Sequence, residues 1–306
     1  MATTTASDPF NKSTDLILRS SDSVDFHVWS IILKEASPMF DTMLGLPQPA
    51  ANPDVPVVPV TEDSATLRGL LELCYPMTPS IMQERHIDTI LRVLEAAMKY
   101  GMEWSAALVA QSLKELADNQ PVRVYAVAQR HGMQELAQYA ARVGLKKPLL
   151  DGYCSELEDI TGAAFYRLVQ YREKCSNVLR TITEDLKWLD RPAEYMWFVC
   201  QNPGCEYAEG EEMKFRGCRP KRWWVLWMDH ALDELEKRPC RETALTMNIE
   251  KVLRGISCVK CLPRAYMDLS KLKQLLAYEV DRKLDEVSSR SDDEFRQRLT
   301  KLRPFR

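Results

Sequence analysis

Two pairs of cysteines carry the clearest chemical signal in this sequence. The first pair, Cys200 and Cys205, encloses Gln-Asn-Pro-Gly, and the second pair, Cys258 and Cys261, encloses Val-Lys. Two short turns that each present a thiolate pair are the usual ligand set of a structural Zn²⁺ site, and four thiolates complete its tetrahedron. Asn-Pro-Gly favours a turn, and Pro263 ends any structure that precedes it. The spacing therefore predicts a closed structural zinc site.

Two other interpretations of the same cysteines stay open. They could be ordinary buried residues that behave as small hydrophobic groups, or they could form a redox disulfide. The gap between the pairs is longer than the roughly 15–20 residues of a compact zinc ribbon, so zinc binding needs a helical hairpin to bring them together. Cys218 and Cys240 are less clearly paired and are substitute ligands at best.

Patterns typical of catalysis or of nucleic-acid binding are weak. The four histidines are scattered, and none belongs to an HExxH or GxSxG motif, so no catalytic residue is predicted. For His230 we expect a packed or hydrogen-bonded side chain. The basic and aromatic run from Arg216 to Trp224 could stack on bases, but the acids at 209–212 cancel its charge. A helix start with its tryptophans in the core explains this run better.

Composition limits the class of protein further. The chain has 306 residues, 45% of them hydrophobic, and a formal net charge of -3. Such a chain can form two or three packed regions, and it has no overall field that would attract nucleic acid or an anionic membrane. We expect an intracellular protein, cytoplasmic or nuclear, because no secretory leader or spanning segment is visible. Nine cysteines then indicate reduced thiols or metal ligands.

The elements that open the chain are a hairpin and two helices. Alternating residues predict strands over Leu16–Arg19 and Val24–Val28, and the polar residues Ser20–Ser23 predict the turn between them. Apolar spacing over 31–36 predicts the first helix, and Pro38 fits the first turn of the second. The order is strand, turn, strand, helix, helix.

This order closely resembles the opening of the BTB/POZ domain. The matching positions are Asp15-Leu16, Phe26-His27-Val28-Trp29-Ser30, Ile32-Leu33, Ser37-Pro38-Met39-Phe40 and Met43-Leu44. Leu70 to Pro76 resembles a later segment of the same domain, in the Leu-x-x-Cys-Tyr-Pro version associated with fungal proteins. The resemblance covers roughly the first 145 residues.

The resemblance implies a protein-interaction adaptor, not an enzyme. BTB domains self-associate, and some bind a cullin scaffold so that the rest of the chain presents a substrate for ubiquitination. The residues it assigns to protein binding are Asp15, Leu16, Trp29, Phe40, Tyr75 and Met77. Family dimers often pair the buried Asp with a Lys or Arg after the motif His, whereas Trp29-Ser30 stands here. We therefore expect a weaker or differently arranged homodimer, with Asp15 hydrogen-bonded locally or near solvent.

The predicted fold class is mainly α with a small β-sheet, followed by helical regions. We expect a disordered tail over 1–12, the BTB/POZ domain over 13–118, a helical extension over 119–190 and a helical region over 191–306. Five of the seven tryptophans and six of the nine cysteines lie beyond residue 187. Two alternatives to the adaptor stay open: an enzyme with its site in the C-terminal half, and a transcription-related scaffold.

Overall fold

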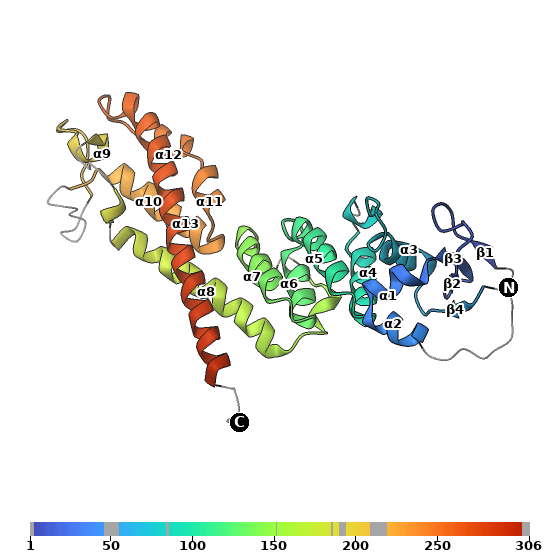
Figure 1. Cartoon of the computed structure of the whole chain (residues 1–306). Coiled ribbons are helices and arrows are strands. Elements are labelled where there is room, and N and C mark those ends of the chain that lie inside the picture. Colours follow the sequence, from blue (N-terminus) through green and yellow to red (C-terminus); the bar gives the residue numbers. More distant parts are fainter. Residues whose placement is uncertain are drawn as a thin grey trace. The chain divides into compact units, whose positions relative to one another are not determined.

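The computed structural model describes residues 3–45, 55–83, 86–150, 152–184, 186–189, 194–208 and 219–301. These residues are mostly helical, with one small four-stranded sheet near the N-terminus, which confirms the predicted fold class (Figure 1). The chain forms two compact units, Met1–Ala128 with Met133–Ala140 and Gln129–Gly132 with Ala141–Arg306. Among the described helices, none combines the length and the apolar character that a membrane crossing requires.

The sheet of the first unit is built on the predicted hairpin. Strands β2 (Leu16–Arg19) and β3 (Val24–Val28) pair in antiparallel register, and the turn between them places Ser23 at a φ of 64°. Strand β4 (Val57–Pro59) joins β2 in parallel at the edge of the sheet, where its proline is tolerated. The strand order is β1-β3-β2-β4.

The N-terminal residues belong to this unit, so the expectation of a disordered tail is wrong for residues 3–12. Strand β1 (Thr4–Thr5) pairs with β3 in parallel register. Phe10 is fully buried, and its ring lies edge-on to Tyr75, with 5.2 Å between ring centroids. A two-residue strand and one isolated aromatic residue have no periodicity from which sequence could predict this packing.

The helices that follow the hairpin complete the first unit and lead into the second. They are α1 (Ser30–Ala36), α2 (Pro38–Gly45), α3 (Ser64–Glu72), α4 (Ile87–Lys99), α5 (Glu103–Ala117), α6 (Pro121–Arg130) and α7 (Gln134–Val143). The Asp63 carboxylate caps α3 by accepting a hydrogen bond from the Thr66 N–H at 2.7 Å. Helices α3 and α4 approach closely at Gly69, where an added Cβ would lie 2.8 Å from a Val93 methyl group.

The second unit is a helical assembly around a tryptophan-rich core. Its longer elements are α8 (Gly162–Glu184), α9 (Met196–Val199), α10 (Arg222–Lys237), α11 (Arg241–Thr246), α12 (Glu250–Arg254) and α13 (Leu262–Lys301). Helix α8 packs against α10 and α13, and α11 packs against α13 (Figure 1). Because α8 shares its core with the later helices, the predicted boundary at residue 190 does not separate two packed regions. Trp197 and Trp227 are fully buried in this core.

Candidate functional site

Four cysteine thiols meet in the second unit. Cys200 directly follows α9, and Cys261 directly precedes α13. The Sγ atoms of Cys200 and Cys258 are 3.7 Å apart, and those of Cys205 and Cys261 are 3.5 Å apart. All four Sγ atoms lie within 4.8 Å of one another, and all four residues are buried. The structure thus brings together the four cysteines that the sequence singled out.

Local turn chemistry explains how each pair is presented. In the first turn the Cys205 N–H donates to the Asn202 carbonyl at 2.9 Å, and in the second the Cys261 N–H donates to the Cys258 carbonyl at 3.1 Å. Asn202 also joins the two turns, because its side-chain Nδ2 donates to the Cys258 Sγ at 3.2 Å. The sequence indicated the turn at Asn202 but not this second contact, which depends on a residue 56 positions away.

A buried carboxylate fixes the start of the short helix that leads to Cys200. Asp268 on α13 accepts a hydrogen bond from the Met196 N–H at 2.9 Å, and its side chain is almost completely buried. An N–H in the first turn of a helix has no partner within the helix, so this carboxylate satisfies it. Asp268 thereby links α9, which precedes Cys200, to α13, which follows Cys261. Sequence reasoning missed it because nothing near Asp268 in the chain marks the contact.

The electrostatics of the cluster favour a bound cation. Burial raises the pKa of Cys205 to about 11 and raises that of Cys261 further. Burial acts in the same direction on Cys258, but the Asn202 side chain and the Cys261 and Lys260 amides outweigh it and lower its pKa to about 6. Hydrogen bonds to sulfur thus stabilise one thiolate, whereas four buried thiolates need a positive charge among them.

The geometry fits a tetrahedral metal ion. A metal–sulfur distance of about 2.3 Å gives sulfur–sulfur edges of about 3.8 Å, close to the two separations above. Within the described parts of the chain, this group consists of four cysteines and includes no histidine or carboxylate. Four protein thiolates leave no position for a reactive water, so the arrangement suits a structural ion. The cluster can therefore bind a metal ion.

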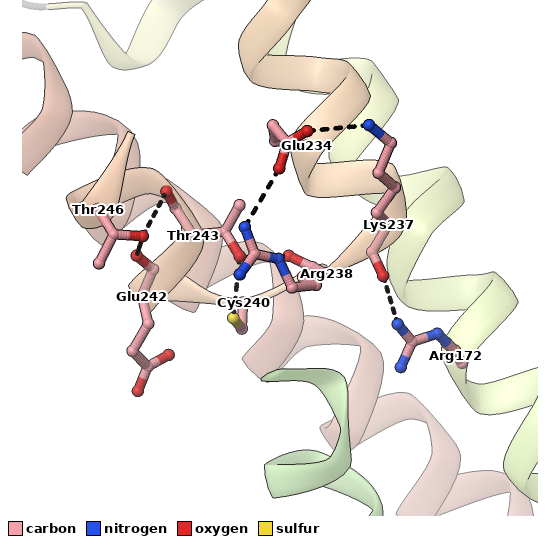
Figure 2. Close-up of polar contacts among 8 residues, drawn as sticks. All are labelled: Arg172, Glu234, Lys237, Arg238, Cys240, Glu242, Thr243 and Thr246. Carbon is pink, nitrogen blue, oxygen red and sulfur yellow. Dashed lines mark hydrogen bonds and ion pairs between the residues drawn. The ribbon is translucent and has the colours of Figure 1, made fainter. Parts of the chain in front are cut away.

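Of the two remaining cysteines of this region, the structure describes Cys240, which stands outside the cluster. Cys218 lies outside the described residues. Cys240 precedes α11, and its Sγ lies 3.2 Å from the Thr243 Oγ1. Figure 2 draws the residues around Cys240 together with the contact of Arg172 with the Lys237 carbonyl. Cys240 is buried but belongs to a different polar network, which makes it a matched control for the four clustered cysteines.

The described part of the basic and aromatic run, residues 219–224, forms a helix start, as expected. Lys221 precedes α10 and is fully buried, and Trp223 and Trp224 lie in the core. Arg216 and the acids at 209–212 lie outside the described residues. His230 is exposed on α10, so a packed histidine is not what the structure shows.

On the first unit, four of the six residues assigned to protein binding fall into an exposed pair and a buried pair. Trp29 and Met77 expose 47% and 38% of their surface. Leu16 and Phe40, by contrast, are buried in the core of this unit, and a role for them in protein binding stays a prediction. The resemblance placed both in the motif but could not tell core positions from contact positions.

Asp15 and Tyr75 act within the domain. The Asp15 carboxylate accepts hydrogen bonds from the Ser30 N–H at 2.8 Å and the Ser30 Oγ at 2.6 Å. Partial burial raises the pKa of Asp15, but these hydrogen bonds outweigh it and the pKa is lowered. The Tyr75 hydroxyl accepts from the Trp29 N–H at 2.9 Å. Both side chains therefore fix the start of α1. Asp15 is hydrogen-bonded locally, which is one of the two outcomes predicted for it.

The first unit combines a mixed four-stranded sheet with short helices, and several large apolar side chains of this unit are exposed. Residues 7–117 match the family model of the BTB/POZ domain, so the N-terminal part of the chain is a BTB/POZ domain. BTB domains are typically interaction modules without enzymatic activity. No curated protein matches the chain.

Proposed function

We propose that this protein is an intracellular adaptor whose BTB domain binds one partner while its second unit presents another. The observation that carries the proposal is the BTB/POZ match over residues 7–117. Exposed apolar side chains on and before its first two helices support it: Trp29, Ile31 and Met39 expose 47%, 61% and 47% of their surface. Side chains of this size on a small domain are typical of binding surfaces.

A structural Zn²⁺ ion at Cys200, Cys205, Cys258 and Cys261 is the second part of the proposal. Zinc is the common ion for a closed set of four thiolates. It would join the turn after α9 to the turn before α13 and so hold the second unit together. In this role the ion has no part in a reaction, and the second unit serves binding rather than catalysis.

The turn between Cys258 and Cys261 offers a surface for the second partner. Val259 exposes 78% of its surface, and Leu262, Tyr266 and Met267, which follow on α13, expose 45%, 59% and 60%. We name these four residues the turn surface. Lys260 and Arg264 are interleaved with them and are exposed, so a protein segment that combines apolar and acidic side chains fits best.

Affinity purification of the tagged chain from cells of the source organism, with mass spectrometry, tests the adaptor proposal. We expect one set of proteins to be lost with Ile31→Asp and another with Val259→Asp. Both residues are highly exposed, so neither change should alter folding. Lys251→Ala, at another exposed position of the second unit, is the control. Identical protein sets from all three variants and the unchanged chain would contradict the proposal.

A cullin scaffold is the more specific partner that we propose for the BTB domain. The resemblance places the contact at Leu70 to Ile81, and Met77 in this segment exposes 38% of its surface. A purified cullin N-terminal domain should bind the chain, and Met77→Asp should weaken this binding. If no binding occurs at tens of micromolar, the ubiquitin-ligase form of the proposal fails while the general adaptor role stands.

We also propose that the BTB domain forms a weak homodimer and is of the fungal type. The local hydrogen bonds of Asp15 to Ser30 take the place of the charged pair that strong family dimers hold. Sedimentation should show dissociation as the protein is diluted, and a dimer that persists at nanomolar concentration would contradict this. The fungal assignment rests on Leu-x-x-Cys-Tyr-Pro, here Leu71 to Pro76.

A further inference from the structure

Lys221 is a fully buried cation without a carboxylate partner among the described residues. Its side chain is completely inaccessible to solvent, and its ammonium donates a hydrogen bond to one backbone carbonyl, that of Cys205, at 2.9 Å. The ammonium also lies over the ring of Tyr207, 3.2 Å from the ring centroid. A buried ammonium is costly unless opposite charge lies nearby, and one carbonyl with one aromatic face offsets only part of that cost.

The contacts of the Lys221 ammonium and of its backbone N–H connect it to the metal-binding turns. Cys205 supplies both the carbonyl that accepts from Lys221 and one of the four clustered thiols. Tyr207 covers the ammonium with its ring and donates its hydroxyl to the carbonyl of Cys200, a second cluster residue, at 3.4 Å. The Lys221 N–H donates to the Trp197 carbonyl at 2.8 Å, which fixes the backbone three residues before Cys200.

Four thiolates around a divalent ion carry a net charge of about -2, and here that charge would be buried. We propose that Lys221 is the charge-balancing residue of the metal centre: its ammonium offsets part of the negative charge of the metal–thiolate group. Without the metal, the centre carries less negative charge, and more of the cost of burying the same ammonium stays uncompensated. Lys221 would therefore favour the metal-loaded fold over the metal-free one. The inference rests on the proposed metal site and adds a residue outside its ligand set.

The test compares two neutral variants of the full chain, Lys221→Gln and Lys221→Met. Glutamine keeps a hydrogen-bond donor for the Cys205 carbonyl, whereas methionine removes both charge and donor. Zinc transfer to a chromogenic chelator should be about tenfold faster in both variants than in the unchanged chain, because a favourable charge interaction is lost. With metal removed by chelator, both variants should unfold at the same or a higher urea concentration than the unchanged chain.

Charge balance predicts that the substitutions weaken zinc retention but do not lower the stability of the metal-free protein. A simple packing role would instead make the substitutions destabilise both forms. Zinc transfer from Lys221→Gln at the rate of the unchanged chain would overturn the proposal, as would variants that are less stable in both states. If Lys221→Gln does not fold, Tyr207→Leu provides a second test. Tyr207 is about half exposed, so the change should be tolerated, and it removes the aromatic ring that lies over the ammonium. Zinc transfer should then be a few-fold faster. An unchanged chain that contains no zinc would instead refute the metal site itself.

Discussion

Replacing Cys258 by serine should destabilise the second unit while leaving the BTB domain folded. Cys200 and Cys258 are 58 residues apart in the sequence, and Cys205 and Cys261 are 56 apart. A cross-link that closes a loop of this length stabilises a fold by about 4 kcal/mol through the entropy of the unfolded chain. Serine removes one ligand and so breaks this link. We expect a loss of about 4 kcal/mol in the unfolding free energy of the second unit.

Tryptophan fluorescence in urea measures this loss selectively. Trp197, Trp223, Trp224 and Trp227 are buried in the second unit, whereas Trp29 and Trp104 of the first unit are largely exposed. The blue-edge emission therefore reports on the second unit, and far-ultraviolet circular dichroism reports on both. Cys240→Ser is the matched control, since it also replaces a buried thiol and should cost only about 1 kcal/mol. Equal shifts of the transition in Cys258→Ser and Cys240→Ser would refute the reasoning.

Three further predictions concern the BTB domain, each measured by thermal unfolding of the full chain. Phe10→Ala should cost about 3–5 kcal/mol because the ring is fully buried; an unchanged melting temperature would show that the N-terminal residues are dispensable. Gly69→Ala should destabilise by about 1–3 kcal/mol, since the contact with Val93 outweighs the helix propensity of alanine; stabilisation would contradict it. Hydrogen bonds from Arg19 lower the pKa of Asp25, so their stabilisation is present above pH 3.8 and lost as the pH falls through the lowered pKa. Asp25→Asn should reduce the loss of stability between pH 5 and pH 2, and an unaltered loss would contradict this.

The hairpin and the cysteine cluster could be predicted because their signals are local. Strands β2 and β3 follow the alternation of residues in the sequence, and serines mark their turn. Each cysteine pair also sits in a short turn with recognisable turn residues. Bringing the two pairs together needed only one assumption, a helical hairpin between them, and α10 with α11 and α12 provides the intervening helices.

Contacts between distant parts of the chain could not be predicted. Asp268 and Lys221 each make their decisive contact with a residue that no local pattern connects to them. The residues Ser291-Asp292-Asp293-Glu294 fit a capping box, which predicts that a separate short helix begins there. This prediction is wrong, because α13 runs on to Lys301. No glycine or proline lies between Pro263 and Pro304 to end it. A local capping signal therefore does not end a helix when the residues on both sides of it favour the helix.

The metal content of the purified full-length chain tests the central claim most directly. Elemental analysis of protein prepared without added metal should find about one zinc per chain, and the same amount in Cys240→Ser. Cys258→Ser and Cys261→Ser should have lost the ion. Protein without zinc, whose melting curve is the same with and without chelator, would contradict the account.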